Sequence, residues 1–250
     1  MIILPGQPPP LPPDLLDRLD GFYPMAEKAG ILAMDYSVKK QHGTIASPVF
    51  TGGKFGNGML RMTASSGYAV MPSGAFNYTS QDFSVTFVLR PSDIATVAIY
   101  VGNYSYTTYG WGILNYGSGQ IGFRTNQAGA VQDTQTSTNA ISLGKTSTIT
   151  AVRSGSTAWI YVDGVDMTTT HGTHVNPATA GPLYLGAYPP YAGTSSGLIG
   201  DVGFVMIHSK ALTSGQARKI PSVIMGATPR RMVLPQQGNR RRRIICAKAA

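Results

Sequence analysis

The sequence predicts an all-β protein built as an antiparallel sandwich. Charged residues make up only 12% of the 250 residues, whereas glycine occurs 30 times and tyrosine 13 times. This composition favours many short strands joined by turns over long helices. Segments in which apolar residues occupy every second position recur at roughly ten-residue intervals, with Gly, Asn or Ser between them, which is typical of sandwiches.

Residues 1–28 are predicted to form an N-terminal arm outside the sandwich. Residues 5–13 are rich in proline, which fixes φ and removes hydrogen-bond donors, so an extended lead-in is expected. Residues 14–23 predict one short helix, because their three leucines share a face and Gly21 can end it. The start of the chain lacks the basic residues of a signal peptide, and no segment is long enough to cross a bilayer. We therefore expect folding in a cytoplasm and no membrane partner.

Alternation of apolar residues predicts the strands. The clearest example is 82–90, in which apolar side chains at every second position predict one buried face. Asp163 and Gly164 lie between two apolar runs and predict a two-residue hairpin turn. Strands are predicted at residues 82–90, 97–104, 148–153, 159–167, 182–188 and 201–208.

A short helix and an arm are predicted after the last strand. Thr213 or Ser214 can cap a helix that runs to Arg218, and Pro221 is expected to block its continuation. Residues 217–250 contain scattered apolar residues without a clear period, so they are predicted to form an extended C-terminal arm.

The positive charge is concentrated in the C-terminal region. Residues 1–209 hold ten Lys/Arg and eleven Asp/Glu, a net charge of −1, whereas residues 210–250 hold ten Lys/Arg and no acid, a net charge of +10, against +9 for the whole chain. Such a region predicts an anionic partner, and a solvated tail is the alternative. The region has no aromatic residue for stacking on bases, which makes nucleic acid an unfavoured partner. An arm that adds a strand to a partner protein and pairs with its acids is preferred.

Several segments carry, in order, the motifs of one family. An Asp, a polar turn and His-Gly-Thr come first, followed by Gly-Lys-Phe-Gly-Asn, a strand, a hairpin, and a closing strand with a short helix. These segments are residues 29–45, 51–62, 82–91, 159–165 and 197–216. They resemble the LamG-like jelly-roll domain of the concanavalin A-like lectin/glucanase superfamily. The resemblance implies a jelly-roll domain at residues 29–216 with an extended arm at each end.

The C-terminal region carries a second resemblance. Residues 211–220, followed by 226–235, are similar to the ends of LamG-like proteins from bacteriophage structural gene modules. This implies a virion protein made in the host bacterial cytoplasm, in a capsid-decoration, tail-fibre or adaptor role. The implied partners are other virion proteins, further copies of the chain in a homo-oligomer, and a host glycan; a free lectin-like protein without a virion role is the alternative. The anchoring residues would be Arg230, Arg231, Arg240, Arg241, Arg242 and Arg243.

Two aromatic clusters are the candidate carbohydrate-binding residues. Aromatic faces stack on the apolar patches of sugar rings, while nearby hydroxyl and amide groups bind the sugar hydroxyls. The alternative is that aromatic residues on strands fill the core or a subunit interface. The candidates are Tyr104, Tyr106, Tyr109, Trp111, Tyr188 and Tyr191.

Catalysis and metal binding have less support. Glycoside hydrolysis needs two facing carboxyl groups, but the chain has one glutamate, Glu27, and no strand that presents two acids on one face, so we expect no enzyme. His171 and His174 lie on a polar loop that does not predict a zinc site. No cofactor is expected except calcium, which the family resemblance implies at Asp35 and Asp201; a turn contact and a strand-edge hydrogen bond are the alternative roles of these two acids.

Overall fold

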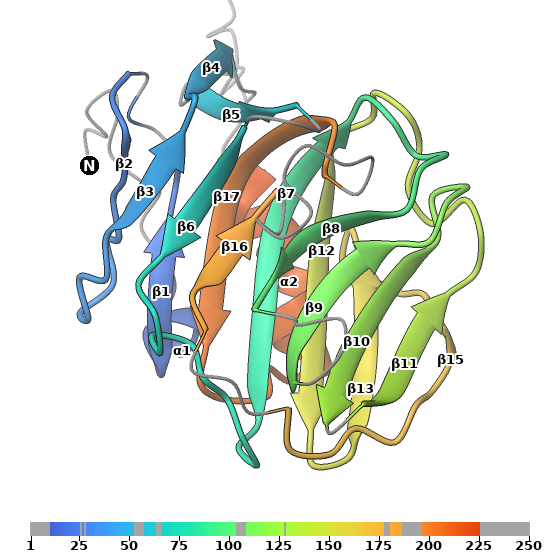
Figure 1. The fold of residues 1–250 in the computed structure, drawn as a ribbon. Helices are drawn as coiled ribbons and strands as arrows, with labels where there is room; N and C mark the ends of the chain where they lie inside the picture. Colours follow the sequence, from blue (N-terminus) through green and yellow to red (C-terminus); the bar gives the residue numbers. More distant parts are fainter. Residues whose placement is uncertain are drawn as a thin grey trace, which may run out of the picture.

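The computed structural model describes residues 11–225, except residues 26, 28, 53–57, 64–66, 104–108, 128, 178–180 and 187–196. Over this part of the chain, two antiparallel sheets pack face to face and two helices lie against the outer side of one of them (Figure 1). The prediction of an all-β antiparallel sandwich is therefore confirmed. Among the same residues, no helix combines the length and the apolar character that crossing a bilayer requires.

Sheet A has eight strands and is centred on β17. β17 pairs with β7 along one side; on its other side, β5 pairs with its first residues and β1 with its last residues. Asp163 and Gly164 join two of the strands with φ values of 51° and 80°, so the predicted hairpin turn is confirmed. The order is β14 (Val165–Asp166), β13 (Thr157–Val162), β12 (Ser147–Ser154), β7 (Phe83–Pro91), β17 (Gly200–His208), β5 (Gly58–Met62) and β4 (Val49–Gly52), with β1 (Leu19–Tyr23) beside β17.

Sheet B has nine strands and forms the other layer. Its central strands β8, β9, β10 and β11 follow one another along the chain and pair as neighbours, whereas β16 reaches the sheet from a distant part of the sequence. The order is β15 (Thr168–Thr170), β11 (Ala130–Thr136), β10 (Ile121–Gln127), β9 (Tyr109–Asn115), β8 (Ala98–Gly102), β16 (Leu183–Leu185), β6 (Tyr68–Met71), β3 (Gly43–Ala46) and β2 (Leu32–Ala33).

The main core lies between the sheets, and a second apolar layer lies outside sheet A. Phe83, Val85, Phe87 and Leu89 of β7 are buried in the main core, as their period-two spacing predicts. The alternate residues of the strand are also buried, because Val88 and its neighbours lie beneath the helical layer. Sheet A is therefore covered on both faces.

The N-terminal segment belongs to the sandwich, and the short helix predicted within residues 14–23 ends earlier than Gly21. Helix α1 spans only Pro13–Leu16, and the chain then turns at Arg18, whose φ is 56°. Leu15 is buried under α2, but Leu16 is 53% exposed, so the leucines do not form one helical face. The following residues gain hydrogen bonds by joining β17 as strand β1. Residues from 11 onward are part of the domain rather than of an arm.

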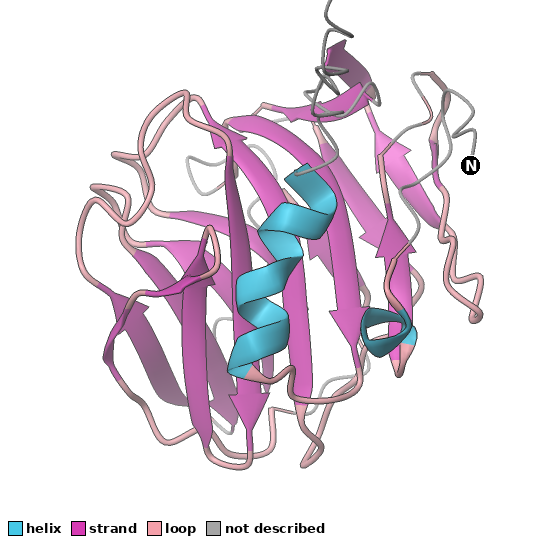
Figure 2. Ribbon diagram, turned by 180° about the vertical axis from the view of Figure 1, so that it is seen from behind, coloured by secondary structure: helices cyan, strands magenta, loops and turns pink. Residues whose placement is uncertain are grey.

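The C-terminal helix is longer than predicted. Helix α2 spans Ser214–Met225 and continues through Pro221, so residues 217–225 belong to the domain and the arm does not begin at 217 (Figure 2). A proline in a helix removes one hydrogen bond and crowds the preceding turn. Here Ala217, Ile220 and Ile224 lie buried against sheet A, and this packing holds the helix together past the proline. The expected cap is confirmed, since Thr213 Oγ1 accepts a hydrogen bond from the Gln216 amide at 3.2 Å.

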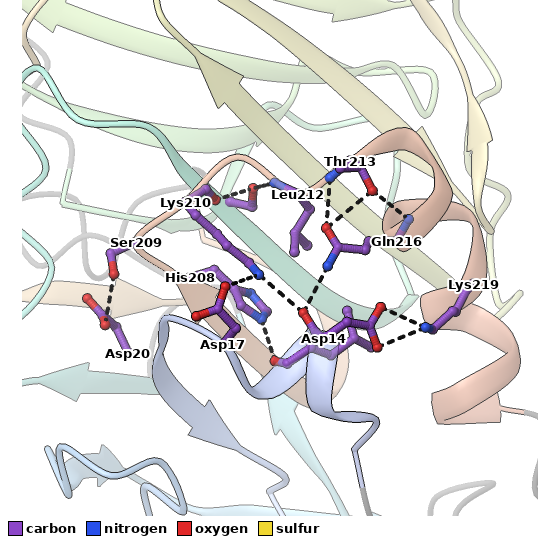
Figure 3. Close-up of polar contacts among 12 residues, drawn as sticks. Asp14, Asp17, Asp20, His208, Ser209, Lys210, Leu212, Thr213, Gln216 and Lys219 are labelled. Carbon is purple, nitrogen blue, oxygen red and sulfur yellow. Dashed lines mark hydrogen bonds and ion pairs between the residues drawn. The ribbon is translucent and has the colours of Figure 1, made fainter.

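Polar contacts join α1 to the chain around α2 (Figure 3). They connect residues almost 200 positions apart and bring the first and last described elements onto one side of sheet A. The contacts are Lys219 Nζ with Asp14 Oδ2 at 2.7 Å, Lys210 Nζ with Asp17 Oδ2 at 2.8 Å, Gln216 Nε2 with the Asp14 carbonyl at 2.8 Å, and His208 Nε2 with the Leu15 carbonyl at 2.8 Å.

Candidate functional site

The structure separates the two described members of the aromatic clusters. Tyr109 begins β9 and is 43% exposed, as a sugar-stacking residue requires. Trp111 is fully buried, and its Nε1 donates a hydrogen bond to the Phe76 carbonyl at 3.3 Å. The assignment of Trp111 to a sugar site is therefore wrong, and the alternative of core packing is confirmed for this residue. Its period-two spacing with buried Ile113 is the sequence signal that indicates the core.

The other four aromatic candidates lie outside the described residues, but the described residues that precede them lie at the end of β8 or beside it. Tyr104 and Tyr106 follow Asn103, which continues β8 and whose amide donates to the Trp111 carbonyl at 3.0 Å. Tyr188 and Tyr191 follow Gly186, whose amide donates to the Tyr100 carbonyl of β8 at 2.8 Å. Tyr100 and Asn103 are three residues apart along β8, a distance of about 10 Å.

The outer face of sheet B, directed away from sheet A, carries a row of residues on five neighbouring strands. Tyr184 of β16 lies opposite Gly102 of β8, Gly102 opposite Gly112 of β9, Gly112 opposite Arg124 of β10, and Arg124 opposite Asp133 of β11. Because neighbours in register share one face, the five residues form one line across the sheet. We call this line the central row. It was not identified from the sequence, because only the strand pairing brings its members together.

An ion pair forms one end of the central row. Arg124 Nε donates to Asp133 Oδ1 at 2.8 Å and Arg124 Nη2 to Asp133 Oδ2 at 2.7 Å, which is a bidentate arrangement. The Tyr116 hydroxyl also donates to Asp133 Oδ1, at 2.7 Å, and the guanidinium lies 5.2 Å from the centre of the Tyr116 ring. The side chains of Arg124 and Asp133 keep 16% and 21% of their surface exposed. This end of the row is therefore rigid and still reached by solvent.

Asp35 has a structural role in a turn. Its Oδ1 accepts hydrogen bonds from the amides of Phe22 at 2.9 Å and Ser37 at 2.8 Å, and its Oδ2 from the amide of Gln41 at 2.8 Å. The Ser37 hydroxyl donates to Oδ2 as well. The turn contact expected as the alternative to calcium is confirmed, and both oxygens of this carboxylate are already used.

Asp201 lies between two arginines at the start of β17. Arg61 Nε donates to Oδ1 at 2.8 Å and Arg90 Nη2 to Oδ2 at 2.6 Å. Burial disfavours the ionised carboxyl group, but the two guanidinium groups outweigh this effect and hold the pKa of Asp201 below its usual range. Two cations beside the carboxylate do not suit a calcium ligand, so the calcium site stays a prediction without support from this donor set. Over the described residues, no three His, Cys, Asp or Glu side chains gather as a metal site.

The two histidines of the polar loop point to different neighbours. His174 is buried, and its Nδ1 and Nε2 lie 2.8 Å from the hydroxyls of Thr125 and Thr134. His171 contacts the Ala158 carbonyl at 3.1 Å instead. Burial lowers the pKa of His174 to about 4. The pair is not arranged to share a metal ion.

Comparison with known proteins identifies the fold family. The family model of the Concanavalin A-like lectin/glucanases superfamily matches residues 63–218. The chain belongs to this superfamily. The predicted family and its jelly-roll fold are thereby confirmed, and the fold includes strands of residues 11–62 that precede the matched region. A comparison with curated proteins gave no match.

Solved structures of the same lectin/glucanase fold include several binding domains. The binding domain of Paraclostridial Mosquitocidal Protein 1 is 14% identical, with a TM-score of 0.69 over 83% of this chain and 52% of that one. Domain 4 of AbnA, a GH43 extracellular arabinanase from Geobacillus stearothermophilus solved with arabinotriose, is 15% identical, with a TM-score of 0.67 over 82% and 98%. The binding domain of Botulinum Neurotoxin DC, in complex with SialylT, is 14% identical, with a TM-score of 0.65 over 84% and 52%. The present chain thus spans about half the length of each toxin binding domain. At this level of identity, the structural similarity shows a shared fold.

Proposed function

We propose that this protein binds carbohydrate without chemical turnover. The observation that carries the proposal is that both tyrosine-rich segments, residues 104–109 and 187–196, begin beside β8. Tyrosine is a residue type that suits stacking on sugars. Two proteins of the same fold support the proposal, because the arabinanase domain was solved with arabinotriose and the neurotoxin domain with SialylT.

The use of the acidic residues supports binding rather than hydrolysis. All eleven Asp and Glu residues lie in the described part of the chain. Each of them accepts a hydrogen bond from another residue of the domain. The donors are backbone amides, hydroxyl groups or the side chains of Lys and Arg. A glycosidase instead needs two carboxyl groups about 5–9 Å apart across the scissile bond. Because each of these acids already has a structural partner, a lectin-like function is favoured over hydrolysis.

Replacing Tyr109 with alanine is expected to weaken glycan binding about three- to tenfold, because one stacking contact is lost. Tyr36→Ala is the matched control, since both tyrosines are 43% exposed but Tyr36 lies in the turn of Asp35, away from β8. Titration of each purified variant with glycans selected from an array measures the effect. If glycan affinity falls equally in both variants, or falls in neither, a role for Tyr109 in binding is contradicted.

We further propose that the basic C-terminal region attaches the domain to a bacteriophage particle. Residues 226–250 contain seven Lys/Arg and no acid, and the anchoring arginines among them lie outside the described residues. The acids of the domain already have internal partners, so pairing of these cations with another molecule is favoured. A neighbouring virion protein with an acidic surface suits this chemistry.

Deletion of residues 226–250 is expected to abolish incorporation into particles while leaving glycan affinity unchanged. The deletion keeps α2 and its apolar layer, because the helix ends at Met225. Replacement of the six arginines at 230, 231 and 240–243 by glutamine is the matched variant that keeps the length of the chain. Mass spectrometry of purified particles measures incorporation. Full incorporation of both variants would contradict the role of the arginines as the anchor, whereas absence of the unaltered protein from purified particles would favour a free lectin-like protein.

A further inference from the structure

We infer that Arg61 and Arg90, on the outer face of sheet A, bind carboxylates of an acidic segment of a partner protein. We call these two residues the arginine pair. The inference rests on the proposed attachment to a particle and deepens it, because it assigns part of the anchor to the folded domain. Its basis is that two guanidinium groups share one buried carboxylate, that of Asp201, while their own side chains stay exposed.

Strand register brings the arginine pair together. Asp201 of β17 lies opposite Arg61 of β5 on one side and opposite Arg90 of β7 on the other. Neighbours in register share one face of a sheet. This is the outer face, because the next residue, Val202, lies in the main core. The carboxylate of the central strand thus directs both guanidinium groups towards one point.

Each guanidinium group uses the same edge to contact Asp201. Arg61 donates from Nε to Oδ1 at 2.8 Å and from Nη2 to Oδ2 at 3.2 Å, and Arg90 donates from Nε and Nη2 to Oδ2 at 2.9 and 2.6 Å. Among the described residues, neither Nη1 group has a hydrogen-bond partner. The side chains of Arg61 and Arg90 are 44% and 34% exposed. Their Nη1–Nη2 edges can therefore bind the two oxygens of an external carboxylate.

The charge of this site favours an anion. Two guanidinium groups face one ionised carboxylate, so one positive charge is in excess. The Arg124–Asp133 pair of sheet B has one charge of each sign and no such excess. Because Asp201 already orders both arginine side chains, an incoming anion loses less affinity to side-chain ordering.

The surroundings of the arginine pair suit a polypeptide. Val49 of β4 lies opposite Arg61 and is 51% exposed, so an apolar side chain borders the cationic groups. Strand β4 ends sheet A and, among the described strands, pairs only with β5. An extended peptide can pair with such a free edge. A nucleic acid offers neither peptide groups for this edge nor aliphatic side chains for Val49.

The apolar layer beneath α2 adjoins the arginine pair. Val88 and Met59 precede the two arginines by two residues on β7 and β5, and both lie in this layer. Ile224, near the end of α2, belongs to the same layer, and Figure 2 shows the helix running along the outer face of sheet A. The basic residues 226–250 follow directly after this helix. One acidic surface of the partner can therefore engage the arm and the arginine pair together.

The test measures binding of a fluorescently labelled oligoglutamate peptide to the full chain in which the six arm arginines are replaced by glutamine. We expect this protein to bind the peptide. Its affinity should fall about tenfold in Arg90→Gln, as the loss of one charge-assisted contact implies. Arg90→Lys should lose about as much, because its ammonium group can pair with Asp201 but has no second edge for the peptide.

A merely structural role of Arg90 would be restored by lysine, so the two variants separate binding from folding. Arg124→Gln is the matched control, since it removes the same group from a bidentate ion pair on the other sheet. The melting temperature of each variant establishes that it folds.

Each outcome decides one point. Weaker binding in both Arg90 variants, with unchanged binding in Arg124→Gln, supports the inference. The arginine pair is overturned as the site if Arg90→Lys restores the affinity, if all three variants weaken equally, if none weakens, or if the starting protein does not bind the peptide. Tighter binding of a single-stranded oligonucleotide through Arg90 overturns the choice of a polypeptide. Failure of the proposed attachment is a separate result, because it appears as full incorporation of the arm variants into particles.

Discussion

Replacing Trp111 with alanine is expected to lower the free energy of unfolding by about 3–5 kcal/mol, which is the usual cost of removing a large buried aromatic side chain. Trp111 is 0% exposed, and its ring centre lies 5.1 Å from that of Phe83 and 6.3 Å from that of Tyr78. The truncation would leave a cavity between the sheets and remove the hydrogen bond to the Phe76 carbonyl. Denaturant titration followed by circular dichroism measures the change.

Tyr109→Ala provides the comparison, because Tyr109 lies two residues away on the same strand and is exposed. Its expected effect on stability is within about 0.5 kcal/mol. The two variants thus separate a core residue from a surface residue within one aromatic segment. A stable Trp111→Ala protein that has lost only glycan binding would show that the indole acts on the ligand rather than in the core.

The domain is expected to lose stability as the pH falls from about 6.5 to 4, because two buried histidines must remain neutral. Burial lowers the pKa of both His174 and His208 to about 4, against about 6.5 in the unfolded chain. Between these values the unfolded state binds the protons first, so acid favours unfolding. The contribution is complete above pH 6.5 and is lost through this window, up to about 3 kcal/mol for each histidine.

The surroundings of the two histidines explain why burial dominates. His208 is enclosed by β17, α1 and the chain before α2; Lys210 disfavours its charged form, whereas the Leu15 carbonyl, Asp20 and Asp17 oppose burial only in part (Figure 3). For His174, Arg153 and His171 add to the effect of burial, and Asp133 opposes it. Protonation of His174 would also change its contacts with two threonine hydroxyls.

Unfolding free energies at pH 7, 5.5 and 4.5 test this expectation. His174→Gln is a useful variant, because an amide can still bond the hydroxyls of Thr125 and Thr134 but does not titrate. Its free energy of unfolding should depend less on pH than that of the unaltered protein. A free energy that stays constant from pH 7 to 4.5 in the unaltered protein would refute the assignment of both histidines.

The strands could be predicted from the sequence where alternation and turn chemistry agree. The period-two residues of β7, the turn at Asp163 and Gly164, and the cap at Thr213 all follow from local pattern. These features depend on residues close together in the chain, so the local sequence is enough to predict them.

Elements decided by distant packing could not be predicted. The leucines before Gly21 suggest a helix, but pairing of Leu19–Tyr23 with β17 determines a strand. Pro221 suggests the end of a helix, but burial of Ile220 and Ile224 against sheet A outweighs its cost. In the candidate site, Trp111 resembled a ligand residue because it lies among tyrosines, and the central row depends wholly on strand register.

The contacts between α1 and the region of α2 connect the C-terminal helix to the first strand of the domain. Helix α2 ends at Met225, and the ion pair of Lys219 with Asp14 connects this helix to the segment leading into β1. Strand β1 pairs with β17 in the middle of sheet A, so α2 is connected through this segment to the central strand of the sheet. We therefore expect a force applied to the chain beyond Met225 to be passed first to sheet A.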